Sequence, residues 1–103
     1  AELAARRIGF EICQTANRVL MAYDSTKPHP IAHLADMGCR IILGTDDPAY
    51  FRTSIEQEYA AASFVLTSEQ FAQIACNAVD LAFCTEEARR RIRNLATAAI
   101  GAR

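Results

Sequence analysis

The pattern of apolar positions in the first half of the chain predicts two short β-strands. In FEIC, residues 10–13, the apolar Phe10 and Ile12 alternate with their neighbours, as in a strand with one face covered. CRIIL, residues 39–43, is a short and mainly apolar run, typical of a strand in a parallel sheet with both faces covered. Between them, residues 31–38 repeat apolar positions with helical period and end at Gly38. We therefore expect a strand, a long loop over residues 14–30, a helix and a second strand.

Helices are predicted for the remainder. A helix already under way at residue 1 is expected to end at Gly9, and three more follow residue 52. The expected N-caps are Thr53 or Ser54, Thr67 with Gln70 completing a capping box, and Thr85 followed by Glu86 and Glu87. Each of these three helices has an apolar stripe along one face. The stripe of the first helix comprises Ile55, Tyr59, Ala62 and Leu66, and that of the second comprises Phe71, Ile74, Ala75, Ala78, Val79, Ala82 and Phe83. The third helix ends at Gly101, and its stripe comprises Ala88, Ile92, Leu95, Ala96 and Ala99.

Composition predicts one soluble domain over residues 1–103. The net charge is −1, and no apolar run reaches the ~20 residues of a membrane span, so neither a membrane nor a nucleic acid is expected as a partner. The cluster Arg89, Arg90, Arg91 and Arg93 follows two glutamates in one helix and is interpreted as a solvated face. Cys13, Cys39, Cys76 and Cys84 lie in apolar segments without zinc or disulfide spacing, which predicts small buried thiols in a reducing cytoplasm.

Two adjacent carboxylates follow the second strand. In GTDDP, Asp46 and Asp47 repel one another unless a cation or a hydrogen-bond donor holds them. Pro48 favours an extended conformation at Asp47, so the two side chains are expected to point in different directions. One carboxylate of such a pair can coordinate a metal while the other accepts a hydrogen bond from a polar ligand. The alternative is a surface turn rich in turn-forming residues.

The position of this pair predicts the architecture. Two parallel strands are too few for a covered sheet, whereas a (β/α)₈ barrel takes ~250 residues and gathers its active site at the C-terminal ends of its strands. We expect an α/β chain that forms the last two β/α units, plus the terminal helices, of a TIM (β/α)₈ barrel. Its earlier part would lie outside this chain.

Three segments carry a resemblance to a known family. FEICQTAN at residues 10–17, HPIAHLADMGCRIILGTDDP at 29–48 and TSIEQEY at 53–59 resemble, in order, the C-terminal portion of the adenosine deaminase family of zinc aminohydrolases. The first resembles the family segment E-x-C-P-x-S-N, from which Gln14 and Ala16 depart. The resemblance covers residues 1 to about 96.

The resemblance implies a TIM (β/α)₈ barrel of the metal-dependent hydrolase type. It also implies a zinc-dependent deaminase that replaces the C6 amine of an aminopurine with oxygen and releases ammonia. It implies that Asp46 is a zinc ligand and that Asp47 binds the purine ring. The histidine ligands of the family, its proton-shuttling glutamate and the histidine that orients the attacking hydroxide have no counterpart here, so the chain alone is expected to be inactive. Adenosine, adenine, a nucleotide and other aminopurines stay open as substrates.

Other polar residues are interpreted structurally. His29 and His33 are spaced i, i+4, but His29 precedes Pro30, so we expect a helix-start residue and a surface residue rather than metal ligands. Asn17 could face a pocket at the end of the first strand, but we expect it to satisfy local backbone. Glu56, Glu58 and Tyr59 could line a pocket, but we attribute them to capping and packing. The rival hypothesis for the whole chain is a non-catalytic helical interaction module in which TDDP is only a turn.

Overall fold

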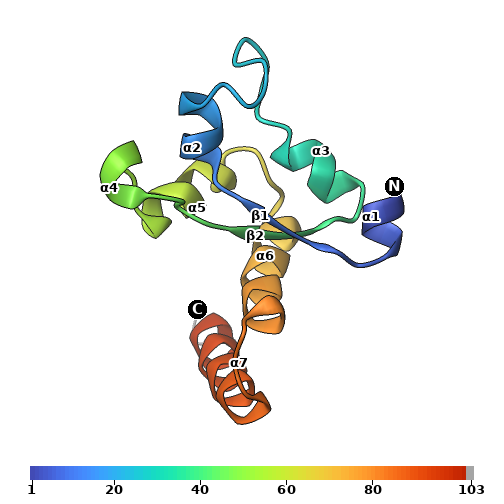
Figure 1. Ribbon diagram of the computed structural model, residues 1–103. Helices are drawn as coiled ribbons and strands as arrows, with labels where there is room; N and C mark the ends of the chain where they lie inside the picture. The colour runs from blue at the N-terminus through green and yellow to red at the C-terminus, as the bar shows by residue number, and fades with distance from the viewer. Residues whose placement is uncertain (102–103) are drawn as a thin grey trace.

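The computed structural model describes residues 1–101, and the side chains of residues 1–99, as seven helices around two strands (Figure 1). In chain order the elements are α1 (Glu2–Ala5), β1 (Gly9–Ile12), α2 (Gln14–Val19), α3 (Ile31–Asp36), β2 (Arg40–Leu43), α4 (Pro48–Phe51), α5 (Ile55–Ser63), α6 (Ser68–Leu81) and α7 (Glu86–Gly101). No helix within residues 1–101 is long and apolar enough to cross a bilayer.

The two strands form a parallel pair, as predicted. Gly9 lies opposite Arg40, and Ile12 lies opposite Leu43 at the other end. The chain crosses from β1 to β2 through α2 and α3, the connection that parallel strands require. Helices α2, α4 and α5 gather at the carboxyl end of the strands, whereas α1 lies at the opposite end (Figure 1). The fold is therefore α/β, with the polar strand-end segments brought together at one edge.

The core forms where the helices cover the strands. Its buried members are Ile12, Ile31, Ile41, Leu43, Ala62 and Ile74. Burial along β2 alternates, because Ile41 and Leu43 are buried while Arg40 and Ile42 are only half-buried. The prediction that both faces of this strand are covered is thus confirmed for the face that carries Ile41 and Leu43. Within the described residues the other face is only partly covered.

Local capping signals give the correct helix boundaries in the second half. The Ser54 side chain accepts a hydrogen bond from the Gln57 N–H and begins α5. Thr67 and Gln70 form the reciprocal capping box that begins α6. Gly38 has a φ of +77°, the left-handed conformation that a glycine adopts at low energy beyond a helix end. These three predictions are confirmed.

Two predictions about the first twenty residues are wrong. The first helix ends at Ala5 rather than at Gly9, and Arg7 takes the left-handed conformation with a φ of +56°. Residues 14–19, predicted as loop, form helix α2. No side chain caps α2 at Cys13, so its start has no local signal in the sequence. It is held instead by hydrogen bonds to α5, which are described below.

The C-terminal helix departs from prediction in two ways. Ile92 and Leu95 of its apolar stripe are 45% and 71% exposed, because α7 packs mainly against α6 and projects away from the strands (Figure 1). Arg89 is not part of a solvated face. Its guanidinium donates to the carbonyl oxygens of Val79, Asp80 and Ala82 and closes the end of α6.

The cysteines are less buried than predicted. Cys76 is exposed on α6, and Cys13, Cys39 and Cys84 are half-buried. All four are free thiols, as their spacing predicts. The apolar neighbours of Cys76 in the sequence face elsewhere on the helix, so an apolar segment did not imply a buried position.

Candidate active site

The site begins where the two strands end. The N–H of Gly44 donates to the carbonyl oxygen of Ile12 at 3.0 Å and carries the pairing one residue past β2. Gly44 is buried, and a Cβ there would overlap the Glu11 carboxylate and lie 3.1 Å from Cys13 Sγ. A larger residue here would have to displace the end of the Glu11 side chain and would crowd Cys13 Sγ. Burial and the charge of Glu11 raise the pKa of the Cys13 thiol.

Asp46 follows in an uncommon backbone conformation. Its φ of +55° lies in the left-handed region, which aspartate tolerates better than most residues. Its side chain is exposed. Among the described residues no hydrogen bond or ion pair engages its carboxylate. A strained backbone that presents an uncompensated carboxylate is a feature of ligand-binding sites.

Asp47 is anchored locally. Its φ is −94°, and its Oδ1 accepts a hydrogen bond from the Tyr50 N–H at 2.9 Å, so that Asp47 caps α4. Pro48 occupies the first turn of α4, a position where its missing N–H has no consequence. Helix α4 was not predicted from the sequence. The hypothesis that TDDP is only a turn also requires Asp47 to cap a helix. The second carboxylate oxygen of Asp47 has no hydrogen-bond partner among the described residues.

A metal at this point would need ligands beyond those described. No group of three or more His, Cys, Asp or Glu side chains within the described residues could hold a metal ion. A catalytic zinc takes about three protein ligands and an open position. Asp46 therefore fits a zinc site only as a single carboxylate ligand, and the predicted Asp46–Asp47 pair is exposed at the strand ends rather than enclosed.

Glu58 lies buried behind this segment. It is 1% exposed, although it carries a carboxylate. Its oxygens accept hydrogen bonds from the Thr15 N–H at 3.3 Å, from the Thr15 hydroxyl and from the Thr53 hydroxyl at 2.7 Å. The sequence interpretation of Glu58 as capping or packing missed this network. Its position four residues before Ala62, on the buried face of α5, was the available signal.

His29 joins the same end of the fold. Its Nδ1 accepts a hydrogen bond from the Ile31 N–H at 3.1 Å, which leaves Nε2 to donate to Asn17 Oδ1 at 3.1 Å. Burial lowers the pKa of His29, and the charge of Glu58 opposes that shift. His29 lies just before Pro30, the N-cap of α3, where it accepts from the first helical N–H, and His33 is exposed, as predicted. The prediction for Asn17 is wrong, because its side chain binds an imidazole and not local backbone.

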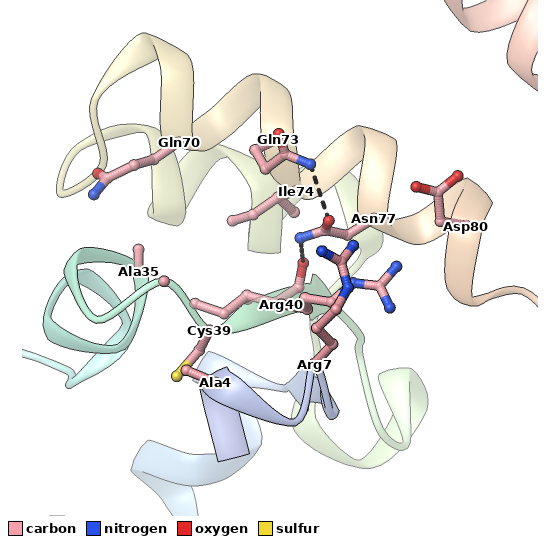
Figure 2. Close-up of a pocket in the computed structure, with 12 residues that line it drawn as sticks. Ala4, Arg7, Ala35, Cys39, Arg40, Gln70, Gln73, Ile74, Asn77 and Asp80 are labelled. Atoms are coloured by element: carbon pink, nitrogen blue, oxygen red, sulfur yellow. Dashed lines mark hydrogen bonds between the residues drawn. The ribbon is translucent and has the colours of Figure 1, made fainter. Parts of the chain in front are cut away.

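A separate cavity lies at the other end of β2. It measures about 390 Å³, and Arg7, Arg40 and Asn77 are among its lining residues. Figure 2 shows Arg7 and Arg40 reaching the same region, beside the hydrogen bonds from Gln73 to Asn77 and from Asn77 to the backbone. Because Arg40 begins β2 and Asp46 follows its last residue, this cavity is distinct from the carboxylate segment.

The parallel strand pair places this chain in the α/β class, whose members bind ligands beyond the carboxyl ends of their strands, where Asp46 and Asp47 lie. The adenosine deaminase family model matches residues 1–99, and the chain belongs to this family. It is 38% identical over 96 residues to adenosine deaminase from Aliivibrio fischeri, covering 91% of this chain and 29% of that enzyme. It is 36% identical over 83 residues to adenine deaminase from Mesorhizobium japonicum, covering 79% and 26%.

Solved structures agree with the family assignment. The apo N6-methyl-AMP deaminase of Arabidopsis thaliana superimposes with a TM-score of 0.87 at 32% identity, covering 99% of this chain and 31% of that one. The ADAL–IMP complex gives a TM-score of 0.86 at 33% identity, with 99% and 31% covered. The fold thus matches one part of adenosine deaminase-type proteins, and the chain spans less than a third of the length of these relatives.

Proposed function

We propose that this chain supplies one strand-end portion of the active site of a zinc-dependent hydrolytic deaminase. The substrate is an aminopurine whose C6 amine is replaced by oxygen from water, with release of ammonia. Asp46 is the zinc ligand of the chain and Asp47 its substrate contact. The observation that carries the proposal is the position of an unpartnered Asp46 carboxylate immediately beyond β2 in a chain of this family.

The geometry suits Asp46 to bind a cation. Its left-handed backbone turns the chain sharply after the strand, and no donor among the described residues neutralises its charge. Zinc, when bound, supplies Lewis-acid chemistry that generates a nucleophile from water near neutral pH. The other ligands come from the remainder of a (β/α)₈ barrel, since the described residues do not bring together the three ligands that a catalytic zinc takes.

Asp47 is suited to orient a ring. The Tyr50 N–H holds Oδ1, which fixes the side chain, and the second oxygen accepts a hydrogen bond from a protonated ring nitrogen or an amine. Fixing the plane of the purine in this way presents C6 in one orientation to the attacking water. Relatives named adenosine deaminase, adenine deaminase and N6-methyl-AMP deaminase support an aminopurine as the substrate class.

The test uses a chimera in which this chain replaces the aligned segment of the Aliivibrio fischeri adenosine deaminase. Asp46→Ala should abolish both bound zinc, measured by mass spectrometry of the metal, and ammonia release. Asp47→Ala should keep zinc and reduce turnover. Asp24→Ala, an exposed aspartate in the segment before α3, is the control and should change neither. Full zinc content in Asp46→Ala would reject the proposal.

One observation favours a different function. The stripe of α7 is exposed at Ile92 and Leu95, and Asp47 caps a helix, as expected for an interaction module with TDDP as a turn. That module needs no metal. A chimera that keeps its zinc and activity in both aspartate variants would favour it over the deaminase.

A further inference from the structure

Glu58 is a buried carboxylate for which the proposed chemistry has no use. It is 1% exposed and lies on α5. None of the ion pairs in the described part of the chain includes it. Burying an ionised carboxylate without a cation is unfavourable unless several donors surround it. Glu58 meets this condition through two hydroxyls and one backbone N–H.

The donors come from the two segments that follow the two strands. Thr15 lies in the first turn of α2, just after β1. Thr53 ends the segment of residues 44–53, which begins after β2 and carries Asp46 and Asp47. The carboxylate therefore links both strand-end segments to α5. A second link runs beside it, because Gln14 Nε2 donates to the backbone oxygen of Glu58 at 3.1 Å.

The link reaches the candidate site through short, rigid steps. The Thr53 N–H donates to the Pro48 carbonyl oxygen at 3.1 Å, which ties Thr53 to the start of α4. Asp47 caps that same helix. A displacement of Thr53 would thus move α4 and, with it, the residues that precede it. An apolar side chain of similar size at position 58 would fill the same space but could not hold Thr53 by a directional bond.

We propose that Glu58 is a positioning residue that fixes residues 44–53 against α2 and thereby holds Asp46 and Asp47 at the strand ends. The bonding part of this inference stands on the geometry alone. Its consequence for a metal and a substrate rests on the proposed function. Glu58 itself touches neither.

Hydrogen exchange on this chain tests the bonding part. In Glu58→Gln, one charged acceptor becomes a neutral amide with a single acceptor oxygen. The Thr15 amide, which donates to the carboxylate, should then exchange roughly tenfold faster or more, as expected for the weakening of a charge-assisted hydrogen bond. The Thr53 amide donates to Pro48 and should also exchange faster, because the Thr53 hydroxyl no longer holds this segment against a charged acceptor. The Gly44 amide, bonded to Ile12 across the strands, should not change. Glu56→Gln removes the same charge from an exposed position of α5 and is the matched control.

Two results would overturn the inference. One is an unchanged exchange rate at Thr15 and Thr53. The other is an equal acceleration at Gly44, which would make Glu58 a general stabiliser of the fold.

Thr53→Val and Thr53→Ser provide the second comparison, because only the serine keeps the hydroxyl. Thr53→Val should reproduce the local acceleration and Thr53→Ser should restore protection, and identical behaviour of the two variants would also contradict the inference.

The consequence for the site is tested in the chimera by competition with a chelator. Glu58→Gln and Thr53→Val should weaken zinc binding by about 10–100-fold, the range found when groups that orient a ligand are removed, and Thr53→Ser and Glu56→Gln should not. Unchanged zinc affinity in Glu58→Gln would reject the positioning role. If instead Asp46→Ala leaves zinc affinity unchanged, the proposed function fails, while the exchange result on the bonding network stands.

Discussion

Asn77 offers a direct measure of how α6 holds the second strand. It is 4% exposed, and its Nδ2 donates to the carbonyl oxygen of Ile41 at 2.9 Å (Figure 2). Because the Gly44 N–H points towards β1, alternation along the strand directs the backbone groups of Ile41 to the opposite edge. Asn77 therefore satisfies a buried carbonyl that β1 cannot reach.

The substitution Asn77→Ala removes this donor without adding apolar surface. A buried carbonyl left without a partner destabilises a fold by about 1–3 kcal/mol. Alanine also favours a helix by up to about 0.7 kcal/mol, which would mask part of the loss. Asn94→Ala corrects for this, because Asn94 is exposed in the interior of α7 and gains the same propensity. The difference between the two variants measures the loss of the two hydrogen bonds of the Asn77 side chain, the one to Ile41 and the one from Gln73.

Urea denaturation followed by far-ultraviolet circular dichroism measures that difference. With a slope of about 1 kcal/mol per molar urea for a chain of this size, the Asn77→Ala midpoint should lie about 1 M or more below that of Asn94→Ala. Equal midpoints would refute the reasoning, because they would mean that the Ile41 carbonyl finds another partner or that the amide contributes no net free energy.

Three further perturbations have expected outcomes in the same assay. Burial lowers the pKa of His29, so the unfolded chain binds a proton more readily than the folded chain. The free energy of unfolding should therefore fall as the pH falls below about 6.5, and His29→Asn should reduce this fall. An undiminished fall in the variant would contradict the assignment. Thr67→Ala removes the capping box of α6 and should lower the free energy of unfolding by about 1 kcal/mol. The control Thr97→Ala, at an exposed position, should change it by no more than about 0.5 kcal/mol. Equal losses in the two variants would contradict the capping role. Gly44→Ala places a methyl group against the Glu11 side chain and Cys13 Sγ and should destabilise by about 1 kcal/mol. Unchanged stability would show that these side chains move aside without cost.

The parts of the fold that were predictable have local causes. The strands were found from short apolar runs, and α6 from Thr67 and Gln70, whose hydrogen bonds join residues three apart. Gly38 marked the end of α3 for a similar reason, because a left-handed residue is needed there. Such signals are contained within a few residues and need no knowledge of the rest of the molecule.

The parts that were missed depend on distant partners. Helix α2 has no capping side chain at its start, and Glu58, 43 residues from Thr15, provides the hydrogen bonds that hold its first turn. Arg89 was placed on a solvated face, although it closes the end of α6 across a turn. A single sequence carries no direct signal of which distant groups meet.

For the candidate site, the sequence predicted where Asp46 and Asp47 lie but not their conformation or hydrogen bonds. The order strand, glycine, two aspartates located Asp46 and Asp47 at a strand end, and the structure places them there. The left-handed backbone of Asp46 and the capping bond of Asp47 were not evident, because both depend on how the chain turns after Leu43. Zinc ligation by Asp46 and purine binding by Asp47 stay predictions.

The central claim is that Asp46 binds the catalytic metal. Anomalous diffraction at the zinc absorption edge from crystals of the chimera measures this directly. The account predicts a zinc peak at about 2.0–2.2 Å from an Asp46 carboxylate oxygen, with Asp47 close by but not bound to the metal. A zinc peak coordinated without Asp46, or an Asp46 side chain directed into solvent beside an occupied zinc site, would contradict it.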